Sequence, residues 1–187
     1  MVDGASIRQS IISILKAIGD DPKREGLIDT PDRVSRSYSE LFSGVGLDPL
    51  DAFTTIFTQE KMGGTVVLEE TPFYSFCEHH LLPFYGVVHM GYIPNKKVAG
   101  ASKLIRALEI LSRRLQIQER LTNELAEVIH RALDADGVIV VIEAEHLCMA
   151  MRGVNKPGAR IITSSLRGPF ANGQISSSDF MGMVYRV

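Results

Sequence analysis

Residues 65–94 read TVVLEETPFYSFCEHHLLPFYGVVHMGYIP and carry the strongest structural signal in the sequence. Their β-branched and aromatic side chains predict strands. Because proline cannot donate a backbone hydrogen bond, we expect the strands to break at Pro72, at Pro83 and at Pro94. A sheet therefore begins near Thr65.

Helical and strand patterns follow in alternation. Apolar residues recur at helical spacing in two stripes, one from residue 104 to 115 and one from 121 to 133, which meet near residues 116–120. Residues 137–152 and 159–166 return to a strand pattern, joined by a turn at residues 155–158. The pattern indicates an α+β fold.

The N-terminal part predicts two helices. Residues 5–18 have the apolar stripe of an amphipathic helix that stops at Gly19. Thr30 and Pro31 mark a second helix start, and Gly44 follows its end. We expect a helical arm and connection over about 1–63 and a catalytic core over about 64–187. Because repeats and low-complexity tracts are absent from the sequence, residues 1–187 are expected to form a single domain.

The composition is that of a soluble globular protein. The 187 residues are 45% hydrophobic and 22% charged, with a net charge of −2. An uninterrupted apolar run of roughly 20 residues is absent, and the acidic N-terminus does not resemble a secretory signal, so we expect a cytoplasmic protein without a membrane segment. The charge gives no support to nucleic-acid binding.

The two cysteines, Cys77 and Cys148, each have a histidine close by in the sequence. Cys77 and His80 are three residues apart, a spacing that lets one bend chelate an ion. His146 and Cys148 would project from the same face if both lay in a strand. Three ligands, Cys77, His80 and Cys148, would leave a fourth zinc position for water, as in catalytic sites. Two unrelated buried thiols are the alternative.

The remaining histidines divide into two groups. His79 and His146 would lie beside the metal without binding it, as groups suited to proton transfer. Each alone would also fit a hydrogen-bonded structural role, but their proximity to both cysteines favours the site. His89 and His130 have no such neighbours and are expected to be structural.

Two segments are candidates for contacts with a nucleotide. Ser102 is a candidate N-cap of a helix that begins after Gly100, where backbone N–H groups attract anions. Lys103, Arg106 and Arg152 could add positive charge, although a solvated basic face is the alternative. In the Gln118–Glu119 pair, a carboxylate could accept both edge N–H groups of guanine, or could be an ordinary polar helix residue.

Three segments strongly resemble the GTP cyclohydrolase I family. They are SFCEHHLLPFYGVVHMGYIP at 75–94, VAGASKLIRALEILSRRLQIQERLT at 98–122 and EAEHLCMAMRGV at 143–154. The TPDRVSRSYSELFSG segment at 30–44 is also similar. Ala101 stands where the family often has leucine, and residues 176–187 are only loosely similar; neither departure affects a proposed ligand.

The resemblance implies a role for each candidate. It implies one zinc ion per subunit held by Cys77, His80 and Cys148, with His79 and His146 in proton transfer and Ser102 in later steps. It also implies that Gln118 and Glu119 contact the guanine edge, and that Lys103, Arg106 and Arg152 surround the triphosphate.

The resemblance further implies a fold, an assembly and a reaction. The family has the tunnelling fold, in which antiparallel strands and paired helices from several subunits form a barrel. Its members form a homo-oligomer, a decamer of two pentamers with active sites between subunits. The reaction converts GTP and water into formate and 7,8-dihydroneopterin triphosphate, the first step of tetrahydrofolate or tetrahydrobiopterin synthesis. The sequence identifies no regulatory partner.

Three other functions fit the residues less well. A nitrile reductase of the same fold needs a nucleophilic cysteine and a nicotinamide cofactor, which the paired His and Cys motifs argue against. A zinc nucleobase deaminase has a P-C-x-x-C turn that this sequence lacks. A catalytically inactive purine-nucleotide-binding or regulatory protein would have no need of both cysteines.

Overall fold

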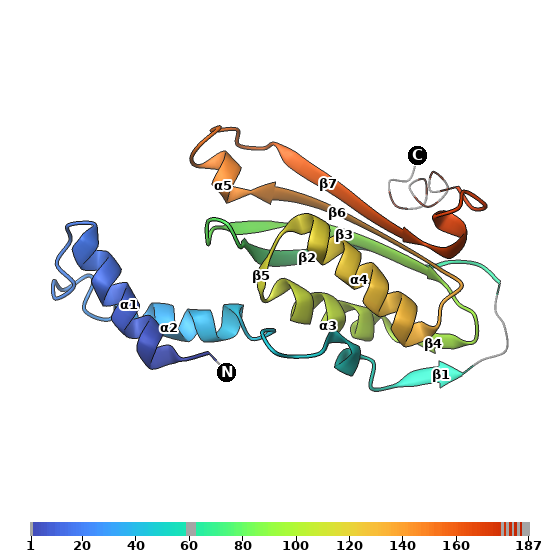
Figure 1. The fold of residues 1–187 in the computed structure, drawn as a ribbon, viewed down its shortest axis with the longest axis horizontal. Helices are drawn as coiled ribbons and strands as arrows, with labels where there is room; N and C mark the ends of the chain where they lie inside the picture. The colour runs from blue at the N-terminus through green and yellow to red at the C-terminus, as the bar shows by residue number, and fades with distance from the viewer. Residues whose placement is uncertain are drawn as a thin grey trace.

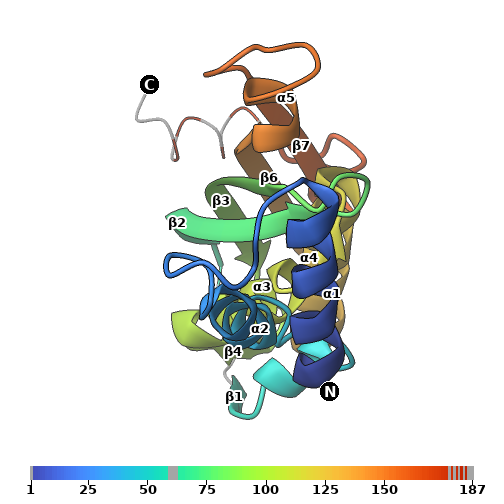
Figure 2. The same ribbon diagram turned by 90° about the vertical axis from the view of Figure 1, so that its left-hand side faces the viewer.

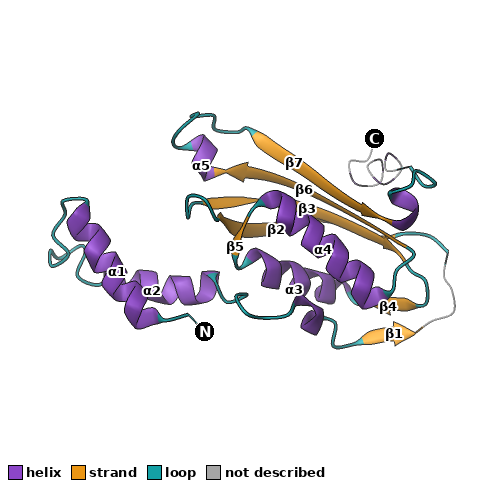
Figure 3. Cartoon of the chain, in the orientation of Figure 1, coloured by secondary structure: helices purple, strands orange, loops and turns teal. Residues whose placement is uncertain are grey.

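The computed structural model describes residues 2–58 and 63–176, together with positions 178, 180, 182 and 184. The fold is α+β, as predicted: a twisted five-stranded sheet has two long helices on one face, and a pair of helices extends from one end (Figures 1 and 3). In this described part of the chain, every helix is too short or too polar to cross a membrane.

The extending pair is the predicted N-terminal arm. Helix α1 (Gly4–Ala17) is followed by Gly19 in a left-handed conformation, with φ of 90°, which glycine adopts without strain. Helix α2 (Thr30–Leu41) packs across α1, and Figure 2 views the pair from its outer end. The Arg8 guanidinium contacts the Asp32 carboxylate at 2.8 Å, which links the two helices.

The main sheet is antiparallel apart from one short parallel pairing. Its strand order is β5-β2-β3-β6-β7, and only the β2–β5 pair is parallel. Two short strands form a separate antiparallel ladder, and two 3-10 turns complete the described elements. The bounds are β1 (Ile56–Thr58), β2 (Val66–Cys77), β3 (Pro83–Ile93), β4 (Lys97–Ala99), β5 (Leu115–Gln116), β6 (Gly137–His146), β7 (Arg160–Arg167), η1 (Pro49–Ala52) and η2 (Gly168–Phe170).

The expected strand break at Pro72 is wrong. Strand β2 continues through Pro72, which pairs with Val87 of β3, and its irregularity lies earlier, between Leu68 and Thr71. Strand β5 reaches β2 only at Phe76 and Cys77, so at Pro72 the described sheet has β3 on one side of β2 alone. Proline is compatible with such an edge position.

Strand β6 is buried on both faces of the sheet. Val138, Val140 and Ile142 join the core formed with helices α3 (Ala101–Ser112) and α4 (Gln118–Leu133). The alternate residues, Ile139 and Val141, pack with Phe170 and Phe180 on the opposite face. Successive side chains of a strand point to opposite faces, so the uninterrupted apolar run of β6 supplies two cores.

The two predicted helical stripes are confirmed as α3 and α4. The connection between them, residues 113–117, contains the short strand β5, which the sequence did not indicate. Gln116 pairs with Cys77, and its carbonyl accepts a hydrogen bond from the Glu78 N–H at 3.0 Å. The start of α4 is therefore fixed beside the end of β2.

Candidate active site

The CEHH sequence lies in the turn between β2 and β3. The Cys77 N–H donates to the Leu82 carbonyl at 2.9 Å, and the Cys77 carbonyl accepts from the Leu81 N–H at 2.9 Å. Leu81 has a positive φ of 53°, which is uncommon for a residue other than glycine, asparagine or aspartate. This tight turn brings His80 back towards Cys77, with 3.6 Å between the Cys77 Sγ and the His80 Nδ1.

Cys148 approaches the turn from a helix, so the expectation that His146 and Cys148 share one strand face is wrong. Strand β6 ends at His146, and helix α5 (Leu147–Ala150) begins at the next residue. His146 pairs with Phe84, and the preceding residue of β3 is Pro83, which has no N–H for the ladder. The strand pairing therefore stops where the helix starts.

The structure brings the three predicted metal ligands together. The ligand atoms of Cys77, His80 and Cys148 all lie within 4.8 Å of one another. In a tetrahedral zinc site a sulfur and a nitrogen ligand are roughly 3.6 Å apart, which matches the distance between Cys77 and His80. Two thiols and an imidazole are also the donors that zinc prefers. The grouping is confirmed, and the identity of the ion stays a prediction.

The electrostatics of the cysteine pair favour a cation. Burial raises the pKa of the Cys148 thiol, and the adjacent Cys77 raises it further, while Arg152 acts in the opposite direction. The Cys148 thiol therefore resists ionisation, because its thiolate would be buried and would lie beside a second sulfur. A metal ion between them removes this penalty by binding both sulfurs.

His79 lies beside the ligands but faces solvent. Its Nδ1 is 4.0 Å from the Cys77 Sγ, and its side chain is 64% exposed. Its Nε2 is 3.9 Å from the Glu78 carboxylate. An imidazole in this place can exchange protons with water while remaining close to the cluster.

His146 is held in a defined orientation at the end of β6. Its ring stacks on Phe84, with centroids 4.7 Å apart and planes 5° from parallel. Its Nε2 lies 2.8 Å from the Gln118 Oε1. Burial lowers the pKa of His146, and Glu119 partly opposes this effect. Burial therefore favours the neutral form of this ring, which lies two positions before the candidate ligand Cys148.

The first turn of α4 carries Gln118 and Glu119 in contrasting environments. Gln118 is buried, with 1% of its surface exposed, whereas Glu119 is exposed. Glu119 acts on the pKa of His146, so its carboxylate is close enough to influence that ring. An exposed carboxylate at this position can accept hydrogen bonds from a ligand.

Sequence reasoning missed the ion pair that braces the turn. Both carboxylate oxygens of Glu78 contact the Arg120 guanidinium, at 2.6 and 3.0 Å. The hydrogen bond from Arg120 lowers the pKa of Glu78. The position of Glu78 between Cys77 and His80 was the only available signal in the sequence. Because both side chains are partly exposed, the pair stabilises the turn only weakly.

The predicted phosphate contacts fall into two separate places. Helix α3 begins at Ala101 with Gly100 as its N-cap, so the expectation that Ser102 caps the helix is wrong. Ser102 and Arg106 are exposed, and the Lys103 ammonium donates to the Thr54 hydroxyl at 2.6 Å. The far end of α3 leads to β5 beside Cys77, so the α3 start lies a helix length, roughly 18 Å, from the metal ligands.

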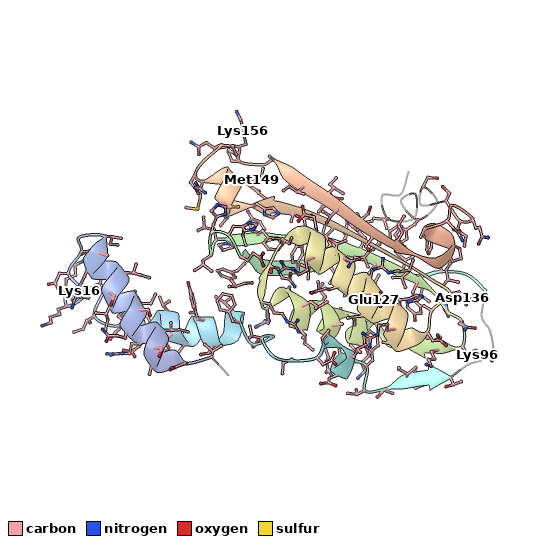
Figure 4. The ribbon with its side chains drawn as sticks, in the orientation of Figure 1. Lys16, Lys96, Glu127, Asp136, Met149 and Lys156 are labelled. Atoms are coloured by element: carbon pink, nitrogen blue, oxygen red, sulfur yellow. The ribbon has the colours of Figure 1, made fainter. Side chains whose placement is uncertain are left out.

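Arg152 lies at the metal end instead. It is exposed, lies two residues after the end of α5, and is close enough to lower the pKa of Cys148. Figure 4 shows this separation along the long axis of the core: Met149 marks α5 at one end, and Lys96 marks the turn before β4 and α3 at the other.

The two histidines expected to be structural are not in the metal cluster of the described residues. His89 is 3% exposed in β3, and its Nδ1 accepts from the Glu70 N–H at 3.3 Å. Burial lowers its pKa. His130 lies in the last turn of α4.

The chain is similar to known proteins over nearly its whole length. The family model described as GTP cyclohydrolase I matches residues 7–185. A protein named GTP cyclohydrolase 1 from Halalkalibacterium halodurans is 50% identical over 184 residues, covering 98% of this chain and 97% of its own. A protein of the same name from Dehalococcoides mccartyi is 50% identical over 188 residues, covering 98% of each chain. A solved structure of the archaeosine synthase QueF-like covers 58% of this chain and 97% of its own at 20% identity, and its TM-score of 0.43 is too low to support a conclusion.

Proposed function

This chain belongs to the GTP cyclohydrolase I family, and from that membership we propose that it opens the guanine imidazole ring of GTP at the Cys77, His80 and Cys148 cluster. The products are formate and 7,8-dihydroneopterin triphosphate, and the pathway supplied is that of folate or biopterin. The observation that carries the proposal is the convergence of these three ligand atoms within 4.8 Å, next to the buried imidazole of His146.

Zinc is the ion that the donor set fits best. Two cysteines and one histidine leave one tetrahedral position for water, the pattern of a catalytic site. Zinc bound there would lower the pKa of that water towards neutrality and so supply the nucleophile. The chain orients the ligands, because the tight turn fixes Cys77 and His80 and the start of α5 fixes Cys148.

Two imidazoles beside the ligands are suited to moving protons. His146, buried and neutral, would exchange a proton with the ring as it opens, and again as the ribose rearranges. His79, exposed to solvent, would protonate a ring nitrogen and recover its proton from water. Glu119 would hold the guanine by accepting hydrogen bonds from its edge.

The separation of the basic residues supports a site completed by a second chain. Arg152 lies at the metal end, but Lys103, Arg106 and Ser102 lie a helix length away. We therefore propose that the α3 start of one subunit faces the metal end of another, with the triphosphate between them. A decamer of two pentamers, whose sheets join into a barrel, would place subunits in contact in this way.

Incubation of the purified protein with GTP tests the activity. We expect formate, measured enzymatically, and a fluorescent pterin after oxidation, in equal amounts. Removing zinc with a chelator should abolish both products, and adding Zn²⁺ but not Mg²⁺ should restore them. Binding of GTP without formate release would support a regulatory protein instead. Full activity in the metal-free protein would contradict the zinc assignment.

A further inference from the structure

The side-chain amide of Gln118 has only one orientation that satisfies its surroundings. Its nitrogen lies 3.0 Å from the Ile142 carbonyl, 2.9 Å from the Ile161 carbonyl and 3.1 Å from the Thr163 hydroxyl oxygen. Carbonyl oxygens only accept, so the NH₂ group must face them. A flipped amide would place its oxygen against two carbonyls. The Gln118 Oε1 therefore faces His146.

A closed loop of hydrogen bonds fixes this amide further. The Thr122 hydroxyl donates to the Gln118 backbone carbonyl at 2.7 Å. Because that hydrogen is used, the 2.6 Å contact between Thr122 and Thr163 needs the Thr163 hydroxyl as donor. Thr163 in turn accepts from the Gln118 amide. Each group in the loop has its partner, and Gln118 and Thr122 are buried at 1% exposure, so the network is rigid.

The direction of the last bond determines where His146 carries its proton. An amide oxygen cannot donate, so at 2.8 Å the His146 Nε2 must be the donor to the Gln118 Oε1. A neutral imidazole with a hydrogen on Nε2 has its lone pair on Nδ1. Stacking on Phe84 holds the plane of the same ring.

We propose that Gln118 is a positioning residue that holds His146 in its Nε2–H tautomer and directs proton exchange with the substrate through Nδ1. This inference rests on the proposed role of His146 in GTP ring opening. It also changes what is expected of Gln118, because the family resemblance implies a contact with the guanine edge. A side chain with 1% exposure, whose NH₂ faces three acceptors, has no donor left for a purine.

A substitution of Gln118 by leucine separates the two roles. Loss of a group that orients a metal-site histidine typically costs 10- to 100-fold in activity. We expect kcat for GTP to fall by about that factor, with KM changed by less than about twofold and zinc retained. A guanine contact would instead raise KM at nearly constant kcat, and that result would overturn the proposal.

A tautomer measurement provides a readout independent of turnover. The chain has five histidines, so ¹³Cδ2 and ¹⁵N labelling of histidine in the zinc-loaded protein gives few signals, and a His146→Asn sample identifies the one from His146. We expect an Nε2–H signal in the wild type and its shift or broadening in Gln118→Leu. An Nδ1–H signal in the wild type would contradict the proposal even if GTP turnover is normal. Absence of formate from the wild type would count against the proposed function alone.

Two further variants guard against a simple folding defect. Thr163→Val removes one of the three acceptors around the Gln118 amide and keeps the side-chain shape. Because the Ile142 and Ile161 carbonyls still orient the amide, kcat should fall by less than in Gln118→Leu, with KM unchanged. Gln116→Leu makes the same amide-to-alkyl change at a buried residue whose amide contacts Leu111 and Glu124 instead. It should leave the His146 signal unchanged. A KM effect in Thr163→Val, or a shifted His146 signal in Gln116→Leu, would contradict the positioning role.

Discussion

The predicted site residues lie at two ends of the core, the α5 end and the start of α3. Those at the α5 end lie close together, whereas those at the α3 start do not form a compact group. At the α5 end, three ligand atoms lie within 4.8 Å of one another and His146 is 8% exposed. At the α3 start, Ser102 and Arg106 are exposed, and the Lys103 ammonium donates to the Thr54 hydroxyl. One chain brings the three candidate ligands together, because the end of β2, the turn after it and the start of α5 place Cys77, His80 and Cys148. The proposed phosphate contacts at the α3 start would be completed by a second chain.

The largest expected effect is at the α5 end. Cys148→Ser replaces a soft thiolate with a hydroxyl, so the protein should lose its zinc and its turnover should fall to background. Metal analysis and formate release check this. Met149→Leu, a volume-conserving change in the same helix, is the matched control and should retain both. Full zinc occupancy in Cys148→Ser would show that this end is not the metal centre.

Removal of His146 separates chemistry from metal binding at the same end. His146→Ala should retain about one zinc per chain and lose roughly 10²- to 10⁴-fold in kcat, the usual effect of removing a positioned acid or base. The KM for GTP should change little. Loss of zinc would instead make His146 a ligand, and near-normal kcat would leave proton transfer to His79.

Charge removal tests the incomplete end. Lys103→Ala combined with Arg106→Ala should raise the KM for GTP by about 10- to 100-fold, because two charged hydrogen-bond donors to the triphosphate are lost. Zinc content should not change. Arg131→Ala, which removes a charge from the last turn of α4, serves as the control for net charge.

Oligomers reassembled from two different variants test whether the α3 start of one subunit completes the site of another. Chains carrying Cys148→Ser and chains carrying Lys103→Ala with Arg106→Ala would be denatured, mixed equally and reassembled. If sites lie between subunits, roughly one quarter of them receive both intact halves, and activity returns accordingly. Activity that stays at the level of the separate variants would place both halves in one chain.

The smallest expected effect concerns the brace of the turn. Arg120→Gln removes the contact with Glu78, but both side chains are partly exposed, so the free energy of unfolding should fall only slightly. Zinc content should be unchanged, because backbone hydrogen bonds hold the turn. Urea unfolding and metal analysis check this. Loss of zinc from Arg120→Gln would mean that metal binding depends on the ion pair between Glu78 and Arg120.

The sequence predicted those features of the site that depend on residue type alone. Thiols and imidazoles near one another indicate a metal centre whatever element they lie in, so Cys77, His80 and Cys148 were found. The helix at Cys148 was not, because β6 stops opposite Pro83, more than sixty positions earlier in the chain. Strand β2 likewise continues through Pro72 because, in the described sheet, only β3 pairs with β2 at that residue, and the sequence does not indicate this pairing.

The anchoring of Gln118 was equally out of reach. Its acceptors are backbone carbonyls of β6 and β7 and a hydroxyl 45 positions away. No spacing rule relates these groups, since they meet only when α4 packs on the sheet. The sequence therefore left two interpretations of the Gln118–Glu119 pair, a contact with guanine or ordinary polar helix residues.

The short connection at residues 113–117 limits how this chain can change in length. Its Gln116 carbonyl accepts a hydrogen bond from the turn that carries the candidate ligands Cys77 and His80, and Gln118 begins α4 with its Oε1 2.8 Å from the His146 Nε2. Inserting or deleting one residue there would displace Gln116 from the turn or Gln118 from His146. A point substitution elsewhere could not restore these contacts. The exposed loop at residues 153–159, by contrast, lies between α5 and β7 with Asn155 and Gly158 at positive φ. Length variation among related chains should therefore collect in that loop and be absent from the connection.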